Sequence, residues 1–336
     1  MSLRRDLLGL SNEVIRGLGL RLVPEYEYRQ MLRDYRGPTW TKPEIPADAK
    51  AYLSNQNPRL VELRRRYRGH PAADHTQWAE ENILRDMSLA DFRGDNHFVY
   101  QTRHSPSAER YLLTAYYVRD QDKLQLFGRF IEDGLFGAFT VAFEDDYLIS
   151  RDLLDTINEL NFIARMRATR KAEPYRVLDI GAGYGRLAYG LTRAFNDASV
   201  VCVDAVPIST FVSEYYLKYR GADRAQVVCL DEATAALKHQ KFDLVTNIHS
   251  FSECTRQSIS WWLDLADGLD VQAFFLLPNS RDHLLSTEAD GSHADFSDLF
   301  RQRGWQLRHK EAIYEQSTVT KAFGLYPNFC FYWFER

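Results

Sequence analysis

The second half of the chain alternates short apolar runs with segments of helical periodicity, and this pattern limits the folds open to it. Strand-like runs are expected at residues 176–181, 198–205, 225–230, 242–248 and 272–278. Helical periodicity is expected from about residue 185 and at 208–219, 232–238, 256–266 and 294–304. Regular strand–helix alternation predicts an α/β fold, in which helices cover both faces of a parallel sheet.

The chain ends differently, with strand-like runs at residues 305–314 and 328–336 and no helix-length segment between them. Adjacent strands without a crossover helix pair antiparallel. The sheet is therefore predicted to finish in a hairpin.

Residues 1–148 lack this regularity. Prolines interrupt the expected helical pieces at 3–20, 26–34, 58–68 and 76–86, and the run YLLTAYYVRD (111–120) could be strand or helix. A regular helix is expected over 150–168, with Ser150 as its N-cap. We therefore expect two domains. Residues 1–148 form a mainly helical cap over the substrate and a candidate homo-oligomer interface, and residues 149–336 form the ligand-binding domain.

Composition excludes several classes of protein. The 336 residues are 45% hydrophobic and 26% charged, and no apolar run approaches the roughly 18–20 residues that span a membrane. A net charge of −4 speaks against a nucleic-acid partner, although residues 1–70 hold 14 Lys and Arg against 8 Asp and Glu. The four cysteines form no C-x-x-C pair, which argues against a structural zinc site and is typical of buried thiols in a reducing cytoplasm. A cytoplasmic protein with no membrane partner is expected.

The stretch VLDIGAGYGRLAYGL, residues 177–191, places a glycine loop directly after the first expected strand. Glycines remove side chains where a backbone must approach a ligand closely, and the helix that follows favours a polar or anionic group at its N-terminus. The expected loop contacts are Gly181, Ala182, Gly183, Tyr184 and Gly185. A glycine loop alone does not say which nucleotide it binds.

Two acidic residues narrow the choice of the nucleotide that the loop binds. Asp179 stands two residues before the first glycine, where it would repel a pyrophosphate but suits the sulfonium and amino groups of S-adenosylmethionine. Asp204 ends the second strand, with Ala205 beside it, and an acid there can accept both ribose hydroxyls. We therefore predict S-adenosylmethionine as the cofactor.

These motifs resemble those of class I S-adenosylmethionine-dependent methyltransferases. The resemblance implies a Rossmann-like sheet of seven strands whose last strand is antiparallel. It also implies that Asp231 receives the adenine amino group and that Asn247 lies where the methyl group emerges. Arg151 is expected to bind the methionine carboxylate, because arginine recognises carboxylates bidentately; a helix-terminal or surface ion pair is the alternative.

A narrower resemblance is to the sugar O-methyltransferases of bacterial natural-product pathways. LDIGAGYGRLA (178–188) matches that family's glycine motif, and FDLVTNIHSFSEC (242–254) resembles its N-x-H-S-F-x-E motif. RDLLDTINELNF (151–162), YLSNQNPRLVELRRRY (52–67) and FRGDN (92–96) resemble its other segments. The resemblance implies methyl transfer to a hydroxyl of a sugar or a glycosylated small molecule.

A sugar hydroxyl is a poor nucleophile, so a general base is expected, and histidine is the commonest. His249 lies just past the fourth strand and is the candidate base, with Glu253 orienting its imidazole or binding another substrate hydroxyl. A structural, hydrogen-bonded histidine is the alternative. Further substrate contacts are expected from Asn279, Arg281 and His283, which follow the fifth strand, with structural roles as their alternative.

Three alternatives stay open. The acids nearest these motifs form no obvious metal triad by spacing, so we expect a metal-independent reaction, with a divalent ion that acidifies the hydroxyl as the alternative. Methylation at nitrogen or carbon of another metabolite is a second possibility. A non-catalytic protein that binds the same cofactor is the third.

Overall fold

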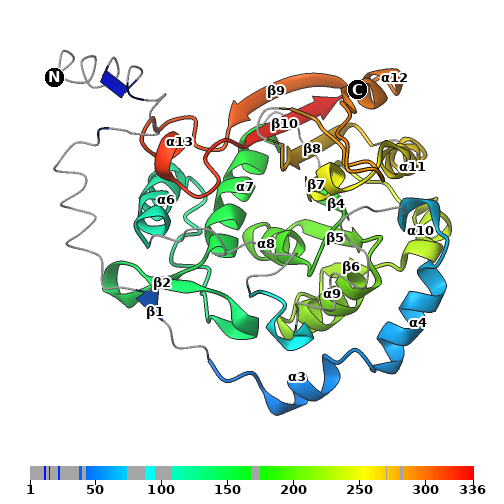
Figure 1. Ribbon diagram of the computed structural model, residues 1–336, viewed down its shortest axis with the longest axis horizontal. Coiled ribbons are helices and arrows are strands. Elements are labelled where there is room, and N and C mark those ends of the chain that lie inside the picture. Colours follow the sequence, from blue (N-terminus) through cyan, green and yellow to red (C-terminus); the bar gives the residue numbers. More distant parts are fainter. Residues whose placement is uncertain are drawn as a thin grey trace.

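The computed structural model describes residues 43–73, 88–94, 108–167, 175–269, 271–280 and 283–336, with a few isolated positions before residue 40. Its centre is a seven-stranded sheet in the order β6-β5-β4-β7-β8-β10-β9 (Figure 1). The strands are β4 (Tyr175–Ile180), β5 (Ala198–Val203), β6 (Ala225–Val227), β7 (Leu244–His249), β8 (Ala273–Pro278), β9 (Gln306–Ala312) and β10 (Cys330–Glu335). The first five run parallel, and β10 is antiparallel to β8 and β9. The predicted Rossmann-like α/β fold with an antiparallel last strand is confirmed.

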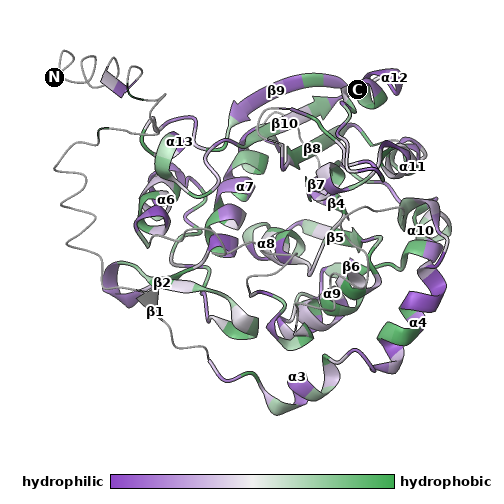
Figure 2. Ribbon diagram, viewed as in Figure 1, coloured by the Kyte–Doolittle hydropathy of each residue, from purple (hydrophilic) through white to green (hydrophobic). Residues whose placement is uncertain are grey.

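The strands divide their apolar side chains between two buried faces. On β4, Leu178 joins one hydrophobic core and Val177 the other; Phe274 and Phe275 of β8 divide in the same way. Strands that are buried on both faces read as continuous apolar runs. The edge strand β9 is instead largely exposed and hydrophilic (Figure 2), which keeps that edge from pairing with other chains.

Helices cover both faces of this sheet. They are α7 (Arg151–Arg167), α8 (Arg186–Ala194), α9 (Pro207–Tyr219), α10 (Leu230–Leu237), α11 (Arg256–Asp267), α12 (Ser297–Gln302) and α13 (Thr320–Phe323), with the 3-10 turn η6 (Ser250–Glu253) after β7. The helix predicted over 150–168 is α7, and the Ser150 hydroxyl accepts a hydrogen bond from the Leu153 amide at 3.1 Å, as an N-cap does.

Residues 43–73 and 88–94 wrap around the outside of this layer (Figure 1). They form α3 (Ala47–Tyr52), α4 (Pro58–Tyr67) and the turns η2 (Pro71–Ala73) and η3 (Leu89–Asp91). Helix α4 contacts α9 and α10, and η2 contacts α11. This segment therefore braces the helices on one face of the sheet.

Residues 108–149 pack mainly on the other face, except that Leu135 and Phe136 join the first core. This segment forms α6 (Ala108–Gln121), the turns η4 (Leu135–Gly137) and η5 (Glu144–Asp146), and strands β2 (Thr140–Ala142) and β3 (Leu148–Ile149), which make a small sheet with β1 (Pro38–Thr39). The ambiguous run at 111–120 is thus helical. Each core draws on residues from both sides of position 148. The domain boundary expected there stays a prediction.

Every helix within the described ranges is too short or too polar to cross a bilayer. The four cysteines form no disulfide, and Cys202, Cys229 and Cys254 are buried.

One buried ion-pair network joins these segments. Arg93, only 4% exposed, donates to both carboxylate oxygens of Glu132 at 3.1 and 2.6 Å, and its Nε donates to Asp152 at 3.2 Å. Tyr184 in the glycine loop also donates to Asp152, and Ser150 donates to Glu132. The network therefore connects the N-terminal residues, the 129–135 loop, α7 and the glycine loop.

Replacing Arg93 should destabilise the whole fold, because it strands a buried carboxylate. We expect Arg93→Met to lower the free energy of unfolding by about 3–5 kcal/mol, measured by urea denaturation. Arg119→Met, which breaks a pair whose side chains are 40% and 38% exposed, is the matched control and should cost less than about 1 kcal/mol. Equal losses in the two variants would show that the network is not a structural anchor.

Candidate functional site

The glycine loop lies at the carboxyl end of β4, where the chain order of the sheet reverses. Gly181, Gly183 and Gly185 have φ angles of 68°, 57° and 87°, a conformation that favours glycine. A Cβ on Gly181 would lie 2.1 Å from the hydroxyl oxygen of Ser250, so no larger residue fits there. A Cβ on Gly183 would meet no atom within 4 Å. The loop is therefore packed on one side and open on the side that faces the cavity.

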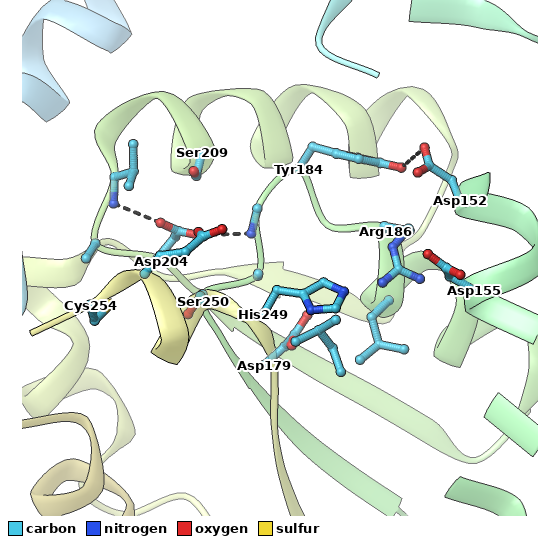
Figure 3. Close-up of a pocket in the computed structure, with 18 of the residues that line it drawn as sticks. Asp152, Asp155, Asp179, Tyr184, Arg186, Asp204, Ser209, His249, Ser250 and Cys254 are labelled. Carbon is cyan, nitrogen blue, oxygen red and sulfur yellow. Dashed lines mark hydrogen bonds between the residues drawn. The ribbon is translucent and has the colours of Figure 1, made fainter. Parts of the chain in front are cut away.

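A cavity opens over this loop, between the ends of β4, β5 and β7 and the start of α7 (Figure 3). Ten of the predicted site residues line it: Arg151, Asp179, Gly181, Ala182, Gly183, Tyr184, Asp204, Ala205, His249 and Glu253. Five others do not line it: Gly185, Asp231, Asn247, Asn279 and His283. Arg281 lies outside the described residues.

Asp179 presents a buried carboxylate to this cavity. It is 2% exposed and accepts a hydrogen bond from Thr246 of β7 at 2.7 Å. It forms no ion pair with any residue that the structure describes, and burial raises the pKa of its carboxyl to about 7. A cationic group placed beside it would favour the ionised form.

Asp204 lies across the loop, at the end of β5. Its two carboxylate oxygens accept hydrogen bonds from the Gly183 amide at 2.9 Å and the Val206 amide at 2.8 Å (Figure 3). Burial nevertheless raises the pKa of this carboxyl to about 6. The two amides fix its orientation, and each oxygen keeps acceptor capacity for a ligand hydroxyl.

Asn247 has a supporting position rather than one on the cavity surface. It is fully buried, and its amide donates to the Ile180 carbonyl at 2.9 Å and to Ser250 at 2.7 Å. Its side-chain oxygen accepts from the Phe251 amide at 3.0 Å. Asn247 thus ties the end of β7 to the end of β4 and holds Ser250 under the glycine loop.

Asp231 is engaged elsewhere, at the first turn of α10. Arg66 of α4 donates to both of its carboxylate oxygens, at 2.9 and 2.7 Å. Val206, Ser209, Cys254 and Trp262 line the cavity on this side instead. The predicted adenine contact of Asp231 stays a prediction.

The opposite end of the cavity carries the predicted Arg151 together with charges that the sequence analysis did not single out. Arg186, the first residue of α8, donates to both oxygens of the buried Glu159 at 2.8 and 2.9 Å. Arg151 pairs with Asp155 at 3.0 Å and lies 4.0 Å from the Tyr326 ring centroid. Asp152, Asp155 and Glu159 are spaced three and four residues apart, so they share one face of α7. That spacing, beside an arginine that directly follows the loop, is the signal that could have indicated this cluster.

His249 ends β7 with a strained backbone, at φ 68° and ψ −31°. Such strain in a residue other than glycine is common at functional sites. Its Nδ1 is buried with no hydrogen-bond partner among the described residues, and its ring lies 5.3 Å from that of Phe329. Burial, together with the charges of Arg151 and Arg186, lowers the pKa of His249 well below its usual range. The imidazole is therefore neutral at pH 7.

The remaining predicted residues form a separate polar group at the rim. Asn279 donates to Glu253 at 2.9 Å, and its own amide donates to Ser252 at 3.0 Å. Glu253 thus accepts a hydrogen bond from Asn279, and no hydrogen bond joins it to His249 in the described structure. His283 is exposed, and its amide donates to the Ser280 carbonyl at 2.9 Å.

Comparison with known proteins now bears on this geometry. Residues 177–266, from β4 to α11, match the model of a methyltransferase domain family. This segment is a methyltransferase domain. No curated protein sequence matches the chain.

Solved structures similar to the methyltransferase domain overlap with about half of the chain. A S-adenosylmethionine-dependent methyltransferase from Clostridium acetobutylicum is 13% identical and covers 53% of this chain and 90% of its own, with a TM-score of 0.40. A magnesium protoporphyrin IX methyltransferase from Synechocystis, solved with S-adenosylmethionine bound, is 14% identical and covers 55% of this chain and 82% of its own, also with a TM-score of 0.40. The assignment therefore depends on the family match and on the glycine loop.

The cofactor of this methyltransferase domain is S-adenosylmethionine, and the residues present fit it. Gly183 leaves open space for a ligand, and Asp204 offers acceptors to a ribose beside it. Asp179 is a buried carboxylate that forms no ion pair with the described residues. A sulfonium and an ammonium supply positive charge, whereas a pyrophosphate would not. Among the described residues, no three His, Cys, Asp or Glu side chains gather to hold a metal ion.

The open space beside Gly183 allows a test of where the cofactor binds. Gly183→Ala places a methyl group in the cofactor space, so we expect S-adenosylhomocysteine to bind more than about tenfold more weakly, a change of about 1.4 kcal/mol by calorimetry. Gly221→Ala is the matched control, because Gly221 has a φ of 61°, lies away from the site and would also meet no atom. Both variants should lose about 1–2 kcal/mol of stability from the left-handed backbone. Equal affinities in the two variants would contradict this placement of the cofactor.

Asp179 should make cofactor binding depend on pH. Its carboxyl has a pKa of about 7 before binding, so protonation below that pH removes the negative charge that attracts the cofactor's positive groups. S-adenosylhomocysteine, which retains the ammonium, should bind about tenfold more weakly at pH 6 than at pH 8. Asp179→Asn should bind weakly at both values. A wild-type pH dependence that persists in Asp179→Asn would assign it to another group.

Proposed function

We propose that the chain transfers the methyl group of S-adenosylmethionine to a hydroxyl of a sugar or a glycosylated small molecule, with His249 as general base. The observation that carries this proposal is the neutral imidazole of His249, which stands on a strained backbone and whose Nδ1 has no partner in the described part of the chain. A general base must be unprotonated before it can accept a proton.

Aromatic side chains beside His249 support a sugar acceptor. The rings of Tyr326 and Phe329 stack at 5.7 Å with an interplanar angle of 16°, and both are partly exposed. Phe329 adjoins the imidazole, and Arg151 lies over Tyr326. Apolar ring faces of this kind can pack against the C–H face of a sugar while its hydroxyls reach polar groups. Asn279 and Glu253 supply polar groups at the rim. Arg281 and His283 remain candidates for further contacts.

The protein's residues need only bind the two substrates and accept one proton. When bound, S-adenosylmethionine supplies a methyl group on a sulfonium, and the sulfur becomes a neutral thioether once that group is transferred. Asp179 would hold the positively charged groups of the cofactor and Asp204 its ribose hydroxyls, and Gly181, Ala182, Gly183 and Tyr184 would line its site. Either Arg151 or Arg186 would face its carboxylate, since both line that end of the cavity. As the acceptor oxygen gains the methyl group, the imidazole of His249 takes the hydroxyl proton.

His249→Asn tests the base with the least disturbance, because asparagine tolerates a positive φ better than most residues. We expect kcat to fall by about 10²–10⁴-fold, because the acceptor hydroxyl loses its proton acceptor, while the Kd for S-adenosylhomocysteine stays unchanged. The measurement is labelled-methyl transfer to a panel of glycosides. His239→Asn, at an exposed histidine just after α10 and outside the cavity, is the control. Near-normal turnover in His249→Asn would remove it as the base.

A further inference from the structure

A second cavity lies behind the wall of the first. Helices α7, α8 and α9 surround it together with Arg93 and the 129–133 segment. Asp152, Tyr184 and Arg186 line both cavities, so the hydrogen bond between Tyr184 and Asp152 forms part of the partition. Neither the family match nor the proposed reaction gives this second space a role.

Arginine side chains dominate the charge of the second cavity. Five arginines and three carboxylates line the cavity, and Glu159 pairs with one of these arginines from behind, so the formal excess is one positive charge. The arginines are Arg93, Arg129, Arg186, Arg193 and Arg220, and the acids are Glu132, Asp133 and Asp152.

Three of these arginines are already paired and shape the walls. Arg93 holds Glu132, and Arg186 holds Glu159 behind it. Arg220 donates to both oxygens of Asp133. The pairs of Arg93 and Arg220 fix the 129–135 loop against the 88–94 segment and the end of α9, and the pair of Arg186 joins α8 to α7, so the cavity is a built feature of the fold.

The remaining two arginines are Arg129 and Arg193. Both are exposed at the cavity, and neither pairs with a carboxylate of the described residues. Arg129 donates to the Leu124 carbonyl. Unmatched guanidinium donors around one space are the arrangement that binds a multivalent oxyanion.

The cavity also has an apolar side. Tyr189 follows Arg186 by three residues and precedes Arg193 by four, so the three lie on one face of α8. Phe130 and Tyr216 line the cavity beside it, and Ile131 next to them is 81% exposed. A ligand with an organic ring attached to its anionic group would cover this surface.

We propose that this second cavity binds a phosphate-bearing small molecule, at a site separate from the methyl-donor site. A phosphate monoester carries up to two negative charges, one for each of the two unpaired arginines, and three oxygens that can accept from Arg129 and Arg193 together. A carboxylate offers one charge and fits less well. S-adenosylmethionine itself carries no phosphate, so it does not compete for this role.

The test is a calorimetric titration of phenyl phosphate into the full chain at constant ionic strength, with S-adenosylhomocysteine saturating. We expect one saturable site. The double variant Arg129→Gln/Arg193→Gln should weaken it by about tenfold or more, because it loses two charge-assisted contacts. Arg301→Gln, an exposed arginine on α12, is the matched control and should leave the affinity unchanged. All variants should bind S-adenosylhomocysteine as the wild type does, which shows that they are folded.

Two further arms sharpen the result. Sodium benzoate should bind more weakly than phenyl phosphate, because it carries a single charge. Tyr189→Leu should weaken phenyl phosphate but not inorganic phosphate. The proposal is overturned if wild-type protein shows no saturable binding, if Arg301→Gln loses as much affinity as the double variant, or if S-adenosylhomocysteine displaces the ligand.

Discussion

The buried charge of Arg93 is the constraint on which the arrangement of this molecule depends. A guanidinium that is 4% exposed must be neutralised within the protein, and Glu132 and Asp152 do so from two different segments. Since Asp152 also accepts from Tyr184, the same network reaches the glycine loop. The N-terminal residues and the methyltransferase domain are thus joined at the partition between the two cavities, so the cofactor loop and the segments around it are expected to fold as one unit.

The cofactor site brings together groups whose burial or backbone strain costs free energy, and a bound ligand can reduce that cost. Asp179 and Asp204 have pKa values raised by burial, and His249 combines a strained backbone with a buried nitrogen that has no partner in the described residues. Such features persist only where the surrounding structure enforces them. Here Asn247, Ser250 and Thr246 do so, by holding the ends of β4 and β7 together. A site prepared in this way favours a cationic cofactor over water.

Sequence reasoning predicted most of the sheet, because strands buried on both faces and glycines at a turn leave strong local signals. It could not predict contacts made across the chain. The pairing of Asp231 with Arg66 joins residues far apart in sequence, and so does the pairing of Arg186 with Glu159. The run at 111–120 was undecidable because its helical state depends on packing against α7. The positions of His249 and Glu253 at the cavity could be predicted, because both follow the apolar run of a strand. The hydrogen bond of Glu253 with Asn279 could not be predicted.

The most direct test of the proposed function is the chemical identity of the transferred methyl group. S-adenosylmethionine carrying a carbon-13 methyl group would be incubated with the protein and a panel of glycosides, and the products examined by nuclear magnetic resonance. The account predicts a methoxy signal coupled to a sugar ring position. An N-methyl or C-methyl signal would contradict it, as would the absence of any transfer by protein that binds S-adenosylhomocysteine.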